Sequence, residues 1–157
     1  FILVNLRGFS RNLRKEINKK GKYYFYDNGI RNAIILNFNP LALRDDVGKL
    51  WENFLFAERM KKQTYTTIYA NNYFWRTWDG QEVDLVEERD GKLFGYEFKW
   101  STRKKISAPK DWLTTYSNAT FEIITPDNYL DFIASDKYLG ALPDLADVSK
   151  ERKFRKK

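Results

Sequence analysis

Short apolar runs with the two-residue alternation of β-strands dominate the chain. These runs are rich in aromatic and β-branched residues, which favour strands. We predict strands at residues 1–7, 23–26, 66–70, 73–77, 82–88, 92–100 and 119–124. Tight-turn signals separate the middle runs at Asn71-Asn72, Asp79-Gly80 and Asp90-Gly91. The middle of the chain is therefore predicted to form an antiparallel meander of three or four strands.

Residues 44–62 change to the period of an amphipathic helix. The apolar stripe of this helix consists of Val47, Leu50, Trp51, Phe54 and Leu55. Shorter helices are predicted at 109–116 and 128–133, and the basic stretch 12–20 is a further helix candidate. Asp27-Asn28-Gly29 reads as a turn after the second strand, followed by a short apolar element at 30–38.

The order of these elements predicts an α/β fold, with a mixed β-sheet that contains the meander and is flanked by helices. The strand at 119–124 follows a helical crossover, so we expect it to run parallel to the strand before it. Residues 140–157 combine Pro143 with dense charge and read as a basic, poorly ordered tail.

Composition fits one domain with a sizeable core, because the 157 residues are 43% hydrophobic and 17% aromatic. No run approaches eighteen uncharged apolar residues, and no signal peptide is recognisable. We therefore expect a cytoplasmic protein that does not enter membranes. The chain begins with Phe1 instead of methionine, which indicates a fragment of a longer protein.

The chain contains no cysteine and no histidine. This excludes Ser/His/Asp and Cys/His catalysis, thiolate zinc sites and imidazole metal sites. Any bound metal must be held by oxygen atoms, which suits magnesium, manganese or calcium.

The net charge is +7, and basic residues cluster near the amino end, at 103–105 and in the tail. Such clusters are compatible with a polyanionic partner such as DNA. They are also compatible with an ordinary solvated surface, so the charge alone does not select a partner.

Candidate chemistry is concentrated in two neighbouring strands. Asp84 lies in the first, and Glu97 and Lys99 lie two positions apart in the second, so their side chains share one face. Two carboxylates on adjacent strands can hold Mg²⁺ or Mn²⁺, and a lysine beside them can orient a water or stabilise a phosphorane. This combination predicts a phosphodiester-cleaving centre with Asp84 and Glu97 as metal ligands and Lys99 as a catalytic residue.

Two further glutamates are candidates. Glu52 lies on the flank of the predicted helical stripe, where it would either contribute a catalytic carboxylate or simply pair with Lys49 at the surface. Glu82 shares a strand face with Asp84 and is a supporting or alternate ligand, although a position at a strand start favours exposure. Trp75, Trp78 and Trp100 are interpreted as packing residues rather than base-stacking platforms.

The arrangement resembles the PD-(D/E)XK nuclease superfamily, which includes many restriction endonucleases and Holliday-junction resolvases. In that comparison Asp84 matches the first acidic position, Glu97 and Lys99 match the acidic-x-Lys motif, and Glu52 matches a helical glutamate. Val83 stands where the superfamily name has proline. The resemblance implies a restriction-endonuclease-like core.

A longer resemblance rests on five blocks of sequence, at 22–30, 48–54, 73–76, 82–86 and 96–99. These blocks look like the carboxy-terminal, nuclease-like domain of a family of prokaryotic AAA+-type ATPases. The resemblance implies a linker at 1–21 that enters from a missing ATPase module, a nuclease-like domain at 22–139 and the tail at 140–157. ATP would bind only the missing module, because this chain has no P-loop.

Two functions remain open at this point. One is a magnesium-dependent nuclease that acts on DNA. The other is a catalytically inactive module of the same fold that binds DNA or protein for the attached ATPase, since a fold supports many functions. A β-rich scaffold without a site would require Asp84 and Glu97 to lie far apart.

Overall fold

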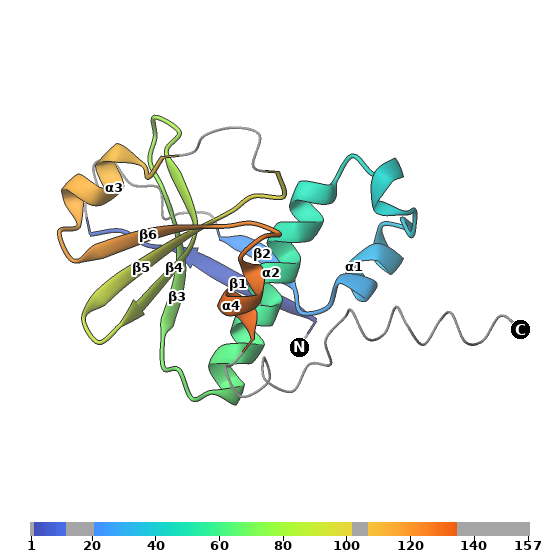
Figure 1. Ribbon diagram of the computed structural model, residues 1–157, viewed down its shortest axis with the longest axis horizontal. Coiled ribbons are helices and arrows are strands. Elements are labelled where there is room, and N and C mark those ends of the chain that lie inside the picture. Colours follow the sequence, from blue (N-terminus) through green and yellow to red (C-terminus); the bar gives the residue numbers. More distant parts are fainter. Residues whose placement is uncertain (1, 12–20, 102–106, 135–157) are drawn as a thin grey trace, which may run out of the picture.

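The computed structural model describes residues 2–11, 21–101 and 107–134 (Figure 1). The predicted helix at 12–20, the basic cluster at 103–105 and the tail at 140–157 lie outside these residues. The described strands are β1 (Leu3–Gly8), β2 (Lys22–Phe25), β3 (Asn71–Arg76), β4 (Glu82–Arg89), β5 (Lys92–Phe98) and β6 (Ala119–Ile124). The described helices are α1 (Asn28–Ile34), the 3-10 turn η1 (Leu41–Leu43), α2 (Val47–Tyr65), α3 (Lys110–Thr115) and α4 (Tyr129–Ile133).

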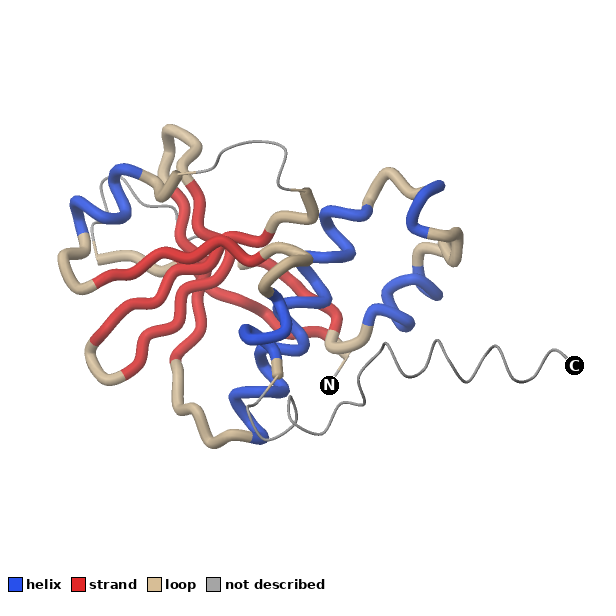
Figure 2. The backbone as a smooth tube through the Cα atoms, in the orientation of Figure 1, coloured by secondary structure: helices blue, strands red, loops and turns tan. Residues whose placement is uncertain are grey.

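The strands form one mixed sheet with the order β2-β1-β3-β4-β5-β6 (Figure 2). β3, β4 and β5 are consecutive antiparallel neighbours, which confirms the predicted meander. β6 pairs parallel to β5 after the crossover through α3, as expected from a helical connection. β1 pairs antiparallel to β2 and parallel to β3.

Two apolar cores cover opposite faces of the sheet. On β5, Tyr96 and Phe98 belong to the core beneath α2 and α4, whereas Leu93 belongs to the core beneath α3. Alternate residues of a strand point to opposite faces, so both faces of this strand are buried. Figure 1 shows α4 lying beside α2, and α3 apart from both. Helices therefore cover both faces of the predicted α/β sheet.

β1 lies inside the sheet and contributes to the core. Its Leu6 is only 2% exposed, and its neighbours are β2 and β3. The strand predicted at 1–7 is thus confirmed, and it is part of the folded unit. The division of the chain into a linker, a nuclease-like domain and a tail stays a prediction.

Three local predictions were wrong. Residues 66–70 do not form a strand, because α2 continues to Tyr65 and Thr67 then adopts a positive φ of 53° that turns the chain into β3. Asn71-Asn72 consequently begins β3 rather than a turn. Asp27 starts a helix instead of closing a turn, since its carboxylate accepts a hydrogen bond of 3.0 Å from the Ile30 amide at the start of α1.

The described helices include none that is long and apolar enough to cross a membrane.

Candidate functional site: a carboxylate and lysine cluster

Asp84 lies in a β-bulge near the start of β4. Tyr73 pairs with Val86 and Trp75 pairs with Val83, so β4 has one residue more than β3 in this interval. A bulge re-aims the side chains beside it. One carboxylate oxygen of Asp84, Oδ2, accepts a hydrogen bond of 2.9 Å from the Phe98 amide at the end of β5. The bulge and this bond fix the Asp84 carboxylate between β4 and β5.

Glu97 and Lys99 lie side by side, as their spacing predicts. Lys99 Nζ is 2.5 Å from Glu97 Oε1, and Phe98 between them packs into the opposite core. The other oxygen, Glu97 Oε2, is buried and has no hydrogen-bond partner in the described residues. A buried carboxylate oxygen normally has a partner, so this atom marks a place for a proton or a cation.

Glu52 enters the cluster from α2. Its Oε1 accepts a hydrogen bond of 2.7 Å from the Tyr24 hydroxyl and lies 3.3 Å from Lys22 Nζ. The exposed Lys49 also approaches, at 3.6 Å from Oε2. Glu52 therefore faces the cluster and also pairs with Lys49, and its catalytic role stays a prediction.

Glu82 is held in the cluster by two cations. Lys22 Nζ lies 2.5 Å from Glu82 Oε1, and the Arg76 guanidinium donates hydrogen bonds of 2.9 to 3.2 Å to both carboxylate oxygens. The side chain of Glu82 is 30% exposed. The preference for an exposed Glu82 at the strand start was therefore wrong, because strand position alone does not reveal a partner from β2.

Lys22, Tyr24 and Arg76 are cluster residues that the motif analysis did not select. Lys22 and Tyr24 alternate along β2 and so share the face that packs on α2. An isolated lysine beside a tyrosine on a strand is a weak signal before the sheet order is known. The order places β1 and β3 between β2 and β4, so nothing in the sequence indicates that Lys22 meets Asp84.

Burial and charge shift the pKa values of the carboxyl groups in opposite directions. Burial, and after it the charge of Asp84, raises the pKa of Glu97 to about 7. Burial also raises the pKa of Asp84, although the ammonium of Lys22 opposes this. Burial acts in the same direction on Glu52, but Lys22 and the Tyr24 hydroxyl outweigh it and lower the pKa of Glu52.

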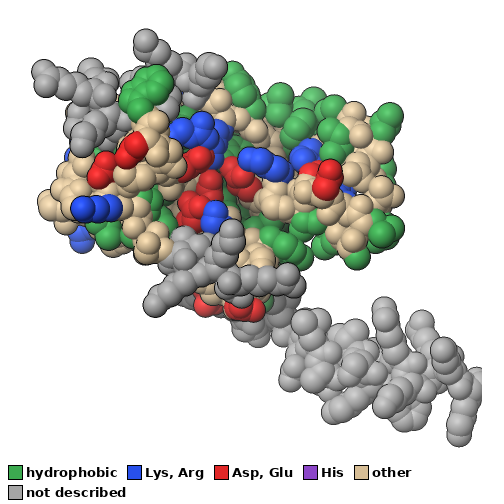
Figure 3. Space-filling model, turned by 90° about the horizontal axis from the view of Figure 1, so that it is seen from above, with side chains coloured by type: hydrophobic (Ala, Val, Ile, Leu, Met, Phe, Trp, Pro, Cys, Tyr) green, Lys and Arg blue, Asp and Glu red, His purple; other side chains and the backbone are tan. Residues whose placement is uncertain are grey.

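The hydrogen bond from the Phe98 amide to Asp84 Oδ2 places the Asp84 carboxylate beside the residue that separates Glu97 from Lys99. Asp84 and Glu97 therefore do not lie far apart, as a scaffold without a site would require. Figure 3 shows acidic and basic side chains interleaved in a depression of the face seen from above. The assignment of metal-binding and catalytic roles to Asp84, Glu97, Lys99 and Glu52 stays a prediction.

The cluster offers oxygen donors of the kind that Mg²⁺ and Mn²⁺ prefer. The unpartnered Oε2 of Glu97, together with the Asp84 carboxylate that is hydrogen-bonded to the neighbouring Phe98 amide, fits a cation held by two carboxylates and water. Within the described ranges, no group of three or more acidic side chains has the arrangement of a ready metal site. The carboxylates of Asp84 and Glu97 thus fit a hard cation as a pair of ligands, and its remaining coordination positions would be left for other ligands.

The predicted packing role holds for two of the three tryptophans. Trp75 is buried and meets Trp112 with ring centroids 5.5 Å apart. Trp100 packs edge-on against Trp51 at 5.4 Å, although it remains 42% exposed. Trp78 is 69% exposed in the turn after β3, so packing does not explain it.

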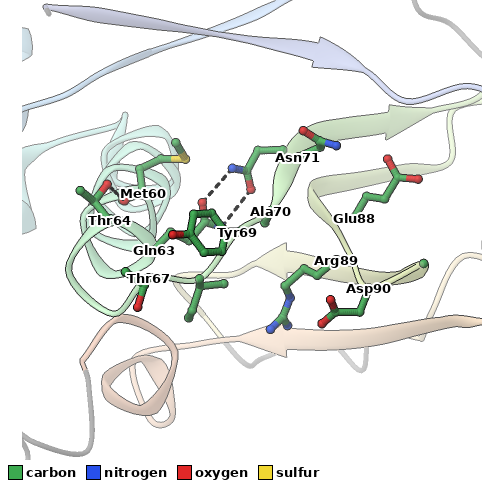
Figure 4. A pocket seen from close by; sticks show the side chains of 13 residues that line it. Met60, Gln63, Thr64, Thr67, Tyr69, Ala70, Asn71, Glu88, Arg89 and Asp90 are labelled. Carbon is green, nitrogen blue, oxygen red and sulfur yellow. Dashed lines mark hydrogen bonds between the residues drawn. The ribbon is translucent and has the colours of Figure 1, made fainter.

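A groove of about 920 Å³ lies away from the cluster, between the end of α2 and the β4-β5 turn (Figure 4). Its floor includes Gln63, which exchanges hydrogen bonds of 3.0 and 2.8 Å with Asn72 and donates one of 2.8 Å to the buried Glu87. None of the predicted site residues lines this groove. Its polar floor is satisfied internally and supplies no chemistry of its own.

A model of a protein family described as a domain of unknown function, DUF4143, matches residues 47–128, about half of the chain. The chain belongs to this family. The matched DUF4143 region contains Glu52, Glu82, Asp84, Glu97 and Lys99, whereas Lys22 lies before it.

Two relatives are uncharacterized proteins of Mycobacterium bovis and Mycobacterium tuberculosis. Each is 29% identical over 110 residues, which cover 68% of this chain and 24% of the relative. The chain thus spans about a quarter of the length of the curated relatives that it matches. No solved structure gives a significant match to the chain.

Proposed function

We propose that this DUF4143 domain is a nuclease-like domain that acts on DNA. Asp84 and Glu97 would hold Mg²⁺ or Mn²⁺, Lys99 would serve as a catalytic residue, and Glu52 would add a further carboxylate. The observation that supports this best is the meeting of Asp84, Glu97 and Lys99 at one end of the sheet, with one buried oxygen of Glu97 left without a partner.

The residues of the cluster suit phosphodiester hydrolysis. When bound, a divalent cation supplies charge neutralisation and an acidified water. The Lys99 side chain is 38% exposed, so its ammonium can reach a phosphate oxygen or an attacking water while it stays paired with Glu97. The amide of Phe98 holds Asp84 in place, so that this carboxylate does not need to be ordered when a substrate arrives.

DNA and an ATPase module are the proposed partners. The net charge of +7 favours a polyanionic partner such as DNA. The much greater length of the relatives is compatible with a domain that works within a longer protein, as the resemblance to AAA+-type ATPases implies. A restriction-endonuclease-like core belongs to the same proposal and is supported by the mixed sheet with its central meander.

A second candidate function is binding without cleavage. The observation that favours it is the neutralisation of the carboxylates from within, since Lys22 and Arg76 pair with Glu82, and Lys99 pairs with Glu97. A cluster satisfied in this way can persist as a structural feature. In this case the domain would bind DNA or a protein for the rest of the parent chain.

Cleavage of DNA by the purified chain tests the proposal. Wild type, Asp84→Asn and Asp127→Asn are incubated with supercoiled and branched DNA in Mg²⁺ or Mn²⁺. Asp127 is exposed and lies outside the cluster, so its amide variant controls for the loss of one negative charge. We expect metal-dependent cleavage that Asp84→Asn reduces at least about 100-fold and Asp127→Asn preserves. Equal cleavage by all three proteins would overturn the assignment.

The non-catalytic alternative gives a different pattern. It predicts binding of DNA without cleavage in any divalent cation, with an affinity that falls as salt rises because counterions are released. Gel-shift or anisotropy titrations between low and moderate salt measure this dependence. Binding that is absent at every salt concentration would remove DNA as the partner in both candidate functions.

A further inference from the structure

We propose that the ammonium group of Lys22 is an internal cation that competes with a divalent cation for Asp84 and Glu52. The inference deepens the proposed function and rests on it, because it concerns the same carboxylates. In the state that the structure describes, the cluster holds its own positive charge. Binding of Mg²⁺ or Mn²⁺ then requires Lys22 to move out of the cluster.

The position of Lys22 Nζ supports this directly. The nitrogen lies 3.3 Å from Glu52 Oε1, 2.5 Å from Glu82 Oε1 and 3.2 Å from Asp84 Oδ1. These carboxylates come from α2 and β4, while Lys22 comes from the edge strand β2. One cationic nitrogen is therefore the common partner of three acidic side chains.

The side chain of Lys22 is largely shielded from water. Its Nζ lies 5.6 Å from the centroid of the Phe74 ring on β3. Only 17% of the Lys22 side chain is exposed. A buried ammonium needs charged partners to offset its desolvation, and here three carboxylates provide them.

Lys22 and a divalent cation compete for the same oxygen of Asp84. Oδ2 of Asp84 is engaged by the Phe98 amide, so Oδ1 is the oxygen left for a cation, and Lys22 occupies it. Magnesium binds oxygen ligands at about 2.1 Å, whereas an ammonium nitrogen donates hydrogen bonds to oxygens at about 2.8 Å. The oxygens of Glu52 and Asp84 lie 3.3 and 3.2 Å from the ammonium, so they must move closer together to bind magnesium in its place.

Lys22, and not Lys99, is the lysine that competes with a divalent cation. Lys99 is more exposed and forms its ion pair with Glu97, so it can remain next to a bound cation without blocking Asp84. Lys22 contacts Asp84 itself. Its flexible four-carbon stem allows the ammonium to swing toward solvent when a cation of higher charge arrives.

Lys49 offers a matched control on the same glutamate. Its Nζ lies 3.6 Å from Glu52 Oε2, but 78% of its side chain is exposed. Removal of Lys49 takes one positive charge away from Glu52 without opening the position between Glu52, Glu82 and Asp84. A difference between the two lysine variants therefore reports the shared position rather than net charge.

Binding of Mn²⁺ to the whole chain tests the inference. Free Mn²⁺ is measured by electron paramagnetic resonance for wild type, Lys22→Met and Lys49→Met. We expect Lys22→Met to bind Mn²⁺ at least about tenfold more tightly than wild type, and Lys49→Met to stay within about twofold. Affinity of Lys22→Met equal to or weaker than that of wild type would overturn the inference.

A measurement on unaltered protein covers the case in which Lys22→Met does not fold. Lysines of wild type are acetylated briefly with and without Mn²⁺, and the modified peptides are quantified by mass spectrometry. Release of Lys22 should raise its acetylation at least about threefold when Mn²⁺ is present, while Lys49 stays unchanged as an internal reference. Acetylation of Lys22 that does not respond to Mn²⁺ would contradict the inference.

Failure of this inference is distinguishable from failure of the proposed function. If wild type cleaves DNA but Lys22→Met binds Mn²⁺ no more tightly than wild type, the proposed nuclease function stands and the competition by Lys22 is refuted. If Lys22→Met binds Mn²⁺ more tightly but no DNA is cleaved, the competition by Lys22 stands and the proposed nuclease function is refuted.

Discussion

Lys22 Nζ lies 3.2 Å from Oδ1 of Asp84, although the two residues are 62 positions apart in the sequence. The contact joins the edge strand β2 to the central strand β4 across two intervening strands. It also joins a residue outside the region matched by the DUF4143 family model to one inside it. The cluster therefore depends on the amino-terminal strands as well as on the meander.

The buried pair of Arg59 and Glu87 is predicted to be a main determinant of stability. Arg59 donates bonds of 2.6 and 2.9 Å to Glu87, which is fully buried, and one of 2.7 Å to the Phe132 carbonyl in α4. Arg59→Met should lower the free energy of unfolding by about 3–5 kcal/mol, because it leaves a buried charge with too few partners. Urea denaturation measures this value.

The control for that variant is Lys61→Met, on the same helix. Lys61 lies 2.6 Å from Glu58, but both side chains are partly exposed. Its removal should change the free energy of unfolding by less than about 1 kcal/mol. Similar losses in the two variants would show that burial does not set the strength of the Arg59 pair.

Two glycines are predicted to respond oppositely to alanine. A Cβ on Gly95 would lie 3.1 Å from the buried Trp112 ring and 3.2 Å from the Thr120 carbonyl, so Gly95→Ala should cost about 1–3 kcal/mol. A Cβ on Gly48 would meet nothing within 4 Å in the first turn of α2, so Gly48→Ala should stabilise by up to about 1 kcal/mol. Thermal unfolding separates the two. A stabilising Gly95→Ala would mean that α3 can move away from β5.

Glu97 is predicted to make stability depend on pH. Its pKa of about 7 in the folded state exceeds the ordinary value of 4.5, so the folded protein holds more protons than the unfolded chain between these values. The contribution of Glu97 to the free energy of unfolding is therefore full below about pH 4.5 and is lost as pH rises through about 7. Urea unfolding from pH 5 to 8 without divalent cations measures the fall.

Glu97→Gln tests the source of that dependence. The amide cannot titrate, so the variant should become more stable relative to wild type as pH rises across this interval. The chain has no histidine, and ordinary side-chain titrations therefore contribute little between pH 6 and 8. Parallel pH profiles for the two proteins would assign the dependence to another group.

Periodicity and turn residues were sufficient to predict most of the sheet. The Asp79-Gly80 and Asp90-Gly91 turns adopt positive φ at Gly80, Asp90 and Gly91, which only a few residue types favour, and so the meander was recognisable. The run at 66–70 has strand-like residues, but the helix before it continues to Tyr65. Local propensity could not show where α2 would end, because packing on the sheet decides the length of a helix.

The proximity of Glu97 and Lys99 could be predicted from the sequence, but the basic side chain of Lys22 in the cluster could not. Strand alternation places Glu97 beside Lys99, and the structure has them 2.5 Å apart. Glu52 and Glu82 share the partner Lys22 from β2, and the sequence does not reveal that two strands lie between β2 and β4. The role of Lys22 follows from strand order, which depends on contacts between distant segments.

Cleavage of DNA by Lys99→Met, measured together with its Mn²⁺ affinity, tests the nuclease assignment most directly. Lys49→Met serves as the control for lost positive charge. The proposed role of Lys99 predicts that metal-dependent cleavage falls at least about 100-fold in Lys99→Met, while Mn²⁺ binding is retained and Lys49→Met cleaves as wild type does. Cleavage by Lys99→Met at the wild-type rate would contradict a catalytic centre built on Asp84, Glu97 and Lys99.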